Sequence, residues 1–209
     1  MSDKRSTSIG VYIIETLAIS DEDAVTSEGS MIYQILSLAH VDCMYKYVRT
    51  IQEFKYFLEE FRKSRYRYLH ISCHGSADRI ATTLEEIPFD ELTKILKSCY
   101  LDNRRLFLSA CLAANEHLAR LILNETQCYS VIGHGEEVRM DAAAIFWSSF
   151  YFAMLADNQT KLRRKEIKSV LRHCSQLYKL PVNYFTEDLN GAIRMVTIKN
   201  GKEIIDDKL

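Results

Sequence analysis

Short apolar runs alternate with segments of helical periodicity along most of this chain, and this alternation constrains the fold more than any other feature. Four of the runs have the length and the branched or aromatic content of buried strands, at residues 8–14, 66–72, 105–109 and 128–132. Between them, apolar residues recur every three or four positions, as on one face of a helix. Such alternation predicts βαβ units, and therefore an α/β fold with a mainly parallel sheet covered by helices on both faces.

The remaining elements follow from weaker signals. A strand at residues 41–48 and a last one at 192–198 bring the expected sheet to about six strands. An acid-rich loop follows the first strand, and residues 79–88 are typical of a hairpin. Thr50 and Glu53 form a capping-box pattern at the start of one helix, and Asp141 is placed to cap another. Helices are expected near residues 31–39, 51–61, 89–98, 118–122, 142–156 and 163–177.

The composition is that of an ordinary globular chain. Of its 209 residues 47% are hydrophobic, and only 7 are Gly and 2 are Pro, so we expect a single domain over residues 1–209 without long linkers. The net charge of −1 provides no global field for nucleic acid or anionic membranes. Basic clusters at residues 62–67 and 163–172 are interpreted as solvated helix faces, which argues against a nucleic-acid partner.

The first residues resemble no signal peptide, because a polar segment leads directly into a short apolar run. The most apolar helical stretch, residues 142–156, is too short to span a bilayer. We therefore expect a cytoplasmic protein without membrane insertion. Its six cysteines are scattered with no CxxC pair, which predicts free thiols in a reducing compartment.

Three of the expected strands end in residues that carry chemistry. These ends are Cys73-His74-Gly75, Ala110-Cys111 and Gly133-His134-Gly135. Open parallel sheets bind ligands at the carboxyl ends of their strands. If the strands that precede His74 and Cys111 are neighbours, both side chains lie at this edge of the sheet.

This pair suits nucleophilic catalysis by a thiolate. Such catalysis needs a cysteine, a nearby base, and hydrogen-bond donors for the developing oxyanion. Cys111 is the candidate nucleophile and His74 the candidate base. The Gly75 N–H suits an oxyanion donor because a residue without a side chain lets substrate approach closely. The Cys111 N–H is the expected second donor, at the start of a helix whose dipole favours negative charge.

The local sequences resemble the CHAT domains, the caspase and separase relatives, which are caspase-like cysteine peptidases, and the resemblance implies a bacterial source. The segment Tyr68–Gly75 is similar to their histidine motif, and Leu106–Cys111 is similar to their Ser-Ala-Cys motif. The stretch from Val138 to Leu155, with its Phe-Tyr pair, also resembles the family, and the likeness covers about residues 8–156. No Gln-Ala-Cys-Arg-Gly motif surrounds the cysteine, as it would in a close animal-type caspase.

The resemblance implies a caspase-haemoglobinase fold and hydrolysis of a peptide bond through an acyl-enzyme. It implies that His74 and Cys111 are catalytic and that His70 has a supporting role. It implies no cofactor and no metal. The expected substrate is a partner protein encoded nearby, in a microbial antiviral defence or cell-death pathway.

An acidic pocket would select a basic residue on the amino side of the scissile bond, the P1 residue. Asp141 corresponds to an aspartate of separase-like relatives, and other acids lie on the same or the first loop. The candidates are Asp141, Glu136, Glu137, Asp21 and Asp23. The segment 124–127 leaves no spare linker to cut, so we expect activity without obligatory self-cleavage and leave open activation by a partner or ligand.

Three other interpretations of these residues make different demands on the sequence. A metal site at His70, Cys73, His74 and Cys111 lacks the paired ligands of structural zinc sites, and Cys73 points to the opposite strand face from the histidines. A nucleotide-binding domain would need a glycine-rich phosphate loop, which the sequence lacks. A catalytically inactive binding module with the same fold stays open, because fold alone does not establish function.

Overall fold

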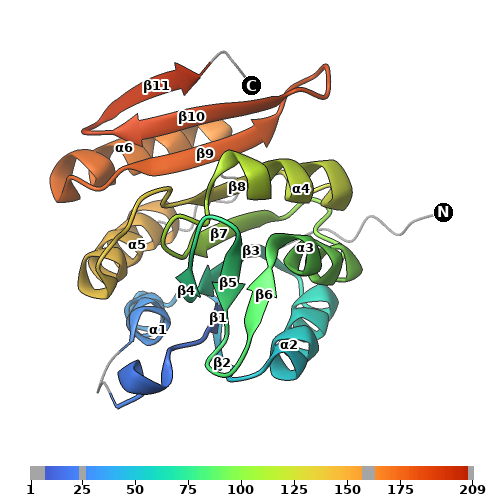
Figure 1. Ribbon diagram of the computed structural model, residues 1–209. Coiled ribbons are helices and arrows are strands. Elements are labelled where there is room, and N and C mark those ends of the chain that lie inside the picture. The colour runs from blue at the N-terminus through green and yellow to red at the C-terminus, as the bar shows by residue number, and fades with distance from the viewer. Residues whose placement is uncertain (1–7, 24–26, 157–162, 207–209) are drawn as a thin grey trace.

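Eight strands form one sheet in the computed structural model, which describes residues 8–23, 27–156 and 163–206. Figure 1 shows this sheet crossing the molecule between two layers of helices. The five strands β8, β7, β3, β1 and β2 pair with one another in parallel. Strands β9, β10 and β11 extend the sheet beyond β8 with antiparallel pairings. The spatial order is β11 (Lys202–Asp206), β10 (Ile193–Lys199), β9 (Val182–Glu187), β8 (Ser130–Gly133), β7 (Arg105–Ser109), β3 (Tyr66–Ser72), β1 (Ser8–Glu15) and β2 (Cys43–Tyr47).

Helices cover both faces of this sheet (Figure 1). One face carries α1 (Glu28–Leu38), α5 (Met140–Leu155) and α6 (Arg164–Tyr178). The other carries α2 (Ile51–Lys63), α3 (Phe89–Ser98) and α4 (Glu116–Thr126). A short 3-10 helix, η1 (Ile19–Asp21), follows β1, and a small antiparallel sheet contains β4 (His74–Gly75), β5 (Arg79–Ala81) and β6 (Glu86–Pro88). Within the described ranges, no helix is both long and apolar enough to cross a membrane.

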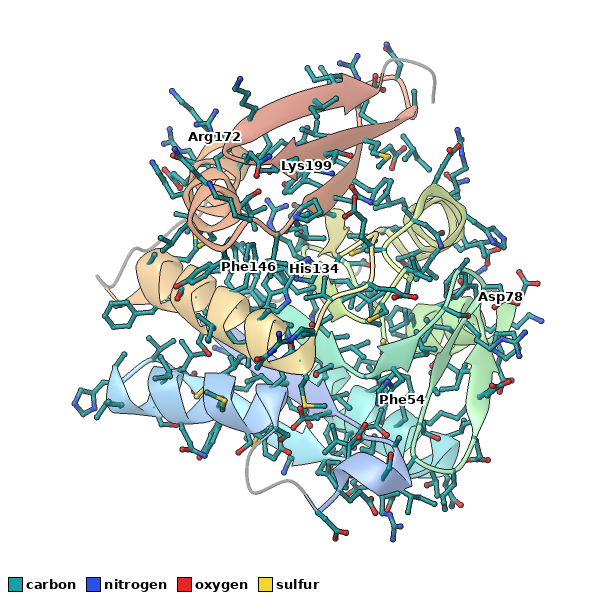
Figure 2. The ribbon with its side chains drawn as sticks, turned by 60° about the vertical axis from the view of Figure 1, so that its left-hand side comes forward. Phe54, Asp78, His134, Phe146, Arg172 and Lys199 are labelled. Carbon is teal, nitrogen blue, oxygen red and sulfur yellow. The ribbon has the colours of Figure 1, made fainter. Side chains whose placement is uncertain are left out.

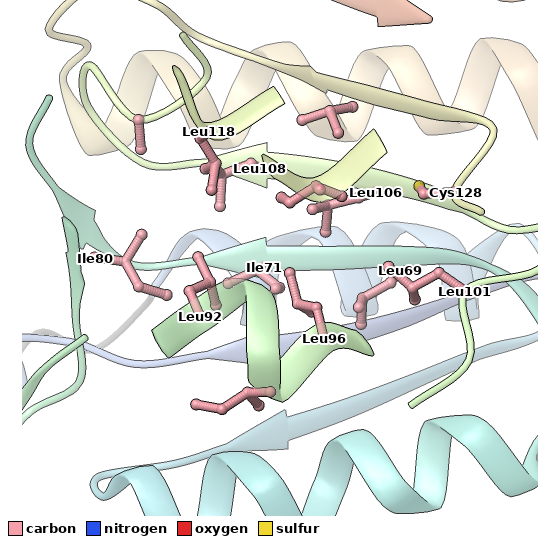
Figure 3. Packing of buried hydrophobic residues seen from close by; sticks show 14 of the residues in the cluster. Leu69, Ile71, Ile80, Leu92, Leu96, Leu101, Leu106, Leu108, Leu118 and Cys128 are labelled. Atoms are coloured by element: carbon pink, nitrogen blue, oxygen red, sulfur yellow. The ribbon is translucent and has the colours of Figure 1, made fainter. Parts of the chain in front are cut away.

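Two hydrophobic clusters lie on the two faces of the sheet, because successive strand side chains point in opposite directions. On β7, Leu106 and Leu108 pack with α3 and α4, whereas Phe107 packs with Trp147 and Phe150 of α5. Figure 3 shows part of the cluster that contains Leu106 and Leu108, between the strands and α3. Burial on both faces explains the continuous apolar runs that predicted these strands.

The α/β fold with helices on both faces is confirmed. The Thr50–Glu53 capping box is present at the start of α2, and the expected hairpin forms β5 and β6. The main sheet has eight strands, however, and not about six. The expectation omitted β9 and β11; β9 escapes a search for apolar runs because Asn183 and Thr186 interrupt it.

Two local expectations are wrong. Arg139, and not Asp141, is the N-cap of α5, so Asp141 lies in the first turn, where it accepts a hydrogen bond from the Ala142 N–H. Cys111 does not begin a helix, because α4 starts at Glu116 with Asn115 as its N-cap. A macrodipole acts within the first turn of its helix, so it does not account for the environment of Cys111.

Candidate active site

Neighbouring strand ends bring His74 and Cys111 to the same edge of the sheet. Strands β3 and β7 are parallel neighbours, with Ser72 opposite Ser109. His74 and Cys111 each follow these serines by two residues, and both line one pocket. The Cys73 N–H donates to the Ser109 carbonyl (3.0 Å), which extends the strand pairing to the pocket.

The His74 imidazole is exposed and held from one side. Its Nε2 lies 2.7 Å from Oδ2 of Asp21, at the end of η1. An ionised carboxylate only accepts hydrogen bonds, so this contact assigns the ring proton to Nε2. In the neutral ring, Nδ1 is then unprotonated and able to take a proton.

The Cys111 thiol is half-buried against the segment that precedes α5. The Val138 N–H donates to Sγ (3.4 Å), and the thiol lies 3.5 Å from the Val138 carbonyl oxygen, to which it donates. These contacts position Sγ in the wall of the pocket.

Gly75 allows the β4–β5 hairpin to lie directly on the Cys111 loop. A Cβ at this position would come within 2.9 Å of the Ala110 Cβ and 3.0 Å of the Cys111 carbonyl oxygen. Real side chains do not tolerate such contacts with backbone, so the close approach requires glycine. The backbone of Gly75 therefore lies directly against the backbone of Cys111.

The pocket is a small hollow that opens to solvent. Its wall comes from the carboxyl ends of β1, β3, β7 and β8 and from the start of α5. The lining residues are Thr16, Leu17, Glu28, Ser72, Cys73, His74, Ser109, Ala110, Cys111, His134, Val138, Met140 and Ala143. Beyond His74 and Cys111, the wall contains two nearly buried groups that can carry a charge, Glu28 and His134, and a partly buried thiol, Cys73.

Glu28 is the acidic residue among those that line the pocket, and the sequence patterns did not predict it. Its side chain is only 5% exposed. Oε1 lies 3.1 Å from Nε2 of His70, and Oε2 accepts from the Ser109 hydroxyl at 2.9 Å. A carboxylate offers about four lone-pair positions. These two bonds leave part of that acceptor capacity unused.

A second buried glutamate, Glu15, fixes the position of Glu28. Its carboxylate accepts from the Gly29 N–H (2.7 Å), the Ser27 hydroxyl and the Tyr45 hydroxyl (2.8 Å). It therefore satisfies a backbone N–H at the start of α1, where Ser27 makes no side-chain cap. Burial, and next the Glu15 charge, raises the pKa of Tyr45 well above its usual value, so the phenol remains a donor.

His70 lies beneath the pocket, buried in a network of polar side chains. Its Nδ1 is 3.0 Å from the Tyr151 hydroxyl, and its Nε2 bonds to Glu28. The Trp147 indole N–H donates to the Ser109 hydroxyl (3.1 Å), which in turn donates to Glu28. Burial raises the pKa of Tyr151 well above its usual value. His70, for which the resemblance implies a supporting role, therefore lies within this buried network.

Cys73 is the other thiol of the pocket wall. It also packs against the cluster on the α3 side, as its position on the opposite strand face predicts. Burial, with the Glu28 carboxylate as a smaller cause, raises the pKa of Cys73 far above its usual value. This thiol therefore stays protonated and is a poor nucleophile.

None of the five acids proposed from the sequence for the specificity pocket lines it. Asp141 is exposed and pairs with Arg139, and Glu136 pairs with Lys199 at 3.4 Å. Glu137 and Asp23 are exposed, and Asp21 contacts His74. Among the described residues, the structure thus brings one of the five to the candidate pair and places Glu28 in the pocket wall. The one sequence signal at Glu28 was its position just before an apolar helical segment.

No protein-family model and no curated protein sequence matches this chain. Its structure is similar to a secreted C11 cysteine protease from Bacteroides thetaiotaomicron, with a TM-score of 0.59, 12% identity, and coverage of 86% of this chain and 66% of that one. Caspase-1 from Spodoptera frugiperda gives 0.52 and 12%, covering 85% and 83% of the two chains. The Arg-specific cysteine proteinase gingipain R gives 0.54 and 12%, covering 96% and 61%.

Such low identities show a shared fold and no more. The chain spans just under two thirds of the length of the C11 protease and of gingipain R. The expected caspase-like α/β architecture is thereby confirmed, and these structural neighbours are cysteine proteases.

Proposed function

We propose that this chain is a cysteine endopeptidase that cleaves a partner protein after a basic residue. The observation that carries the proposal is the shared pocket of His74, Cys111 and Glu28 at the carboxyl edge of the sheet. A histidine and a cysteine on neighbouring strand ends meet the geometric test for a base and a nucleophile. The fold shared with cysteine proteases supports the same reading.

In the first half of the reaction, Nδ1 of His74 takes the proton of the Cys111 thiol. The thiolate attacks the carbonyl carbon of the scissile bond, and the N–H groups of Gly75 and Cys111 donate to the oxyanion. The S–C bond forms, and the C–N bond breaks as the imidazolium gives its proton to the leaving amine. Asp21 holds the imidazole in the tautomer that this transfer needs.

In the second half, His74 takes a proton from a water molecule, which attacks the acyl-enzyme. The S–C bond breaks, the carboxylic acid leaves, and the proton returns to sulfur. The same imidazole serves as base in each half, which requires it to be exposed to both solvent and substrate. The half-exposed ring, with 53% of its side-chain surface accessible, meets this requirement.

The charge of the pocket supports a basic P1 residue. Glu28 accepts a hydrogen bond from Ser109 and lies beside His70, and no Lys or Arg among the described residues lies within ion-pair distance of it. A carboxylate held in a nearly dry wall attracts a guanidinium or ammonium group strongly, because screening there is weak. Glu28 replaces the five acids suggested by the sequence in this role.

A peptide library that varies only the P1 residue tests the proposal. We expect kcat/KM for Arg or Lys at P1 to exceed that for Asp by about 10²-fold or more, since an acidic side chain would meet the Glu28 charge. Cleavage sites are read by mass spectrometry of the products. A preference for Asp would contradict the acidic pocket, and no cleavage of any peptide would favour the inactive binding module.

The proposal also covers the family group, the source, the cellular location and the activation of this chain. The motifs around His74 and Cys111 support membership of the CHAT group and a bacterial source. The scattered free cysteines support a reducing, cytoplasmic setting. We further propose that residues 1–209 act as one domain and that the substrate is a partner encoded nearby in a defence or cell-death pathway. Activation by that partner or a ligand, without self-cleavage, fits the short connection between α4 and β8.

A further inference from the structure

The short helix η1, which carries Asp21 to His74, has no anchor in the hydrophobic core. None of its three residues is buried, and Ile19 is exposed. Two backbone hydrogen bonds close the turn, from the Asp21 N–H to the Ala18 carbonyl (2.9 Å) and from the Glu22 N–H to the Ile19 carbonyl (3.3 Å). Local bonds of this kind shape a turn, but a segment with few buried contacts moves easily relative to the frame. A contact outside the turn must therefore fix its position.

Glu22, the residue directly after η1, makes that contact. Its Oε1 accepts a hydrogen bond from the Tyr47 hydroxyl (2.6 Å) and lies 2.8 Å from Nε of Arg49. The glutamate side chain is only 23% exposed, so water screens this ion pair less than one at the open surface. Burial, and next the bond to Glu22, raises the pKa of Tyr47, so the phenol stays protonated and donates.

Both partners of this glutamate belong to a well-supported part of the frame. Tyr47 is the last residue of β2 and pairs with Glu15 of β1. The Arg49 N–H donates to the Glu53 carboxylate of α2 (2.8 Å), and the Arg49 carbonyl accepts from the Leu84 N–H (3.1 Å). The end of β2 and the start of α2 thus provide a fixed point to which the turn is tied.

We infer that Glu22 is a positioning residue of the active site, which holds Asp21 within reach of His74. The series of contacts leads from Tyr47 and Arg49 to Glu22, along the backbone to Asp21, and from its Oδ2 to Nε2 of His74 (2.7 Å). Glu22 is not one of the described residues that line the pocket, so it acts through Asp21. This inference rests on the proposed function, and it adds a residue that determines how often the imidazole is correctly oriented.

Kinetics separate positioning from a general structural role. In Glu22→Ala we expect kcat to fall about tenfold, the effect of one hydrogen bond to a charged group, with KM within about twofold because no substrate contact is lost. In an Asp21→Ala background the same substitution should change kcat by less than about twofold, since two residues that act through one contact are not additive. A fall of about tenfold in both backgrounds would show that Glu22 does not act through Asp21 and would overturn the inference.

Arg49 tests the same anchor from its other side. Its side chain is about half exposed, so Arg49→Gln is expected to fold. We expect this variant to lower kcat in the same direction as Glu22→Ala, but by less, because the bond from Tyr47 remains. Arg49→Lys keeps a cation near the carboxylate and should recover most of the rate. A rate in Arg49→Lys as low as in Arg49→Gln would speak against the ion pair as the anchor.

Glu203→Ala is the matched control for Glu22→Ala. The Glu203 side chain is 20% exposed and pairs with two cations, Lys168 and Arg172. Figure 2 shows Arg172 on α6, at the opposite end of the molecule from Phe54 of α2. Removing this carboxylate should therefore leave kcat within about twofold. A fall as large as in Glu22→Ala would mean that any lost ion pair slows the reaction, which would overturn the inference.

A spectroscopic measurement decides the matter without catalysis. In protein with ¹⁵N-labelled histidine, the Nε2–H proton of His74 is followed by NMR, and a spectrum of His74→Ala assigns its signal. A half-exposed ring exchanges this proton rapidly with water unless the hydrogen bond to Asp21 protects it. We expect a resolved signal in the wild type and in Glu203→Ala, a weakened one in Arg49→Gln, and none in Glu22→Ala.

Each outcome bears on one proposal or the other. An unchanged His74 signal in Glu22→Ala, or no signal in the wild type, overturns the anchoring role even if peptides are cleaved. Loss of the signal in Glu22→Ala of a protein that cleaves nothing supports the anchoring role while the proposed peptidase function fails. If Glu22→Ala does not fold, Arg49→Gln gives the answer: a weakened signal supports the role of Glu22, and an unchanged one overturns it.

Discussion

Replacing Cys111 with alanine is expected to abolish peptide hydrolysis, with a fall in kcat of about 10⁴-fold or more, as when other enzymes lose their nucleophile. The reason is that no acyl-enzyme can form without Sγ. The free energy of unfolding should change by less than about 1 kcal/mol, because the residue is small and only half-buried. Initial rates on an Arg-P1 peptide and urea denaturation measure the two effects.

Cys43→Ala is the matched control for this prediction. Cys43 is also a half-buried free thiol, but it lies on β2, where its sulfur contacts Ser37 and the Tyr33 carbonyl. Its removal is expected to leave the rate within about twofold, as for a residue away from the site. Hydrolysis that survives in Cys111→Ala at the wild-type rate would show that another group performs the reaction.

Replacing Glu28 with glutamine is expected to lower kcat/KM for basic P1 residues by about 10²–10³-fold, because a guanidinium or ammonium group would be buried without its counter-charge. Glutamine keeps the shape of the side chain, and its amide can still bond to His70 and Ser109. The protein should therefore fold, with a loss of about 1–3 kcal/mol from imperfect bonding in the buried network. Peptides with an uncharged P1 residue should lose much less.

Glu136→Gln makes the same chemical change on an exposed acid. Glu136 pairs with Lys199 outside the pocket, and exposed ion pairs contribute little, so we expect less than a twofold change, or about 0.4 kcal/mol, in kcat/KM. Asp141→Asn offers a second comparison at a residue that the sequence favoured. If either substitution lowers cleavage after Arg as strongly as Glu28→Gln, the pocket acid is the one suggested by the sequence and not Glu28.

Elements with a strong local pattern were predictable from the sequence. Helix α3 begins and ends where expected, because Pro88 precedes it and an apolar stripe from Phe89 to Leu96 faces the core. Strand β9 was not predictable in this way. Its Asn183 is polar, yet it is buried because it donates to the Ala114 carbonyl and accepts from Thr197, two partners distant in the sequence.

In the candidate site, too, residues with a local sequence signal could be predicted, and residues that depend on distant partners could not. His74 and Cys111 could be paired from the sequence, because each follows an apolar strand and parallel strand ends meet at one edge. Glu28 could not, since its place in the pocket depends on Glu15, a buried glutamate that reads in sequence as part of a solvated acidic loop. The anchoring role of Glu22 likewise becomes visible only when its two distant partners are known.

Covalent labelling tests the central claim most directly, namely that Cys111 is the nucleophile of a pocket for basic residues. The protein is treated with the chloromethyl ketone of N-acetyl-arginine, in which a thiolate displaces chloride, and the adduct is located by peptide mapping. We predict a single adduct on Cys111. It should form much more slowly in His74→Ala, and the wild-type protein should react much more slowly with the chloromethyl ketone of N-acetyl-aspartate. An adduct on Cys73, or equal rates of labelling by the arginine and aspartate reagents, would contradict the account.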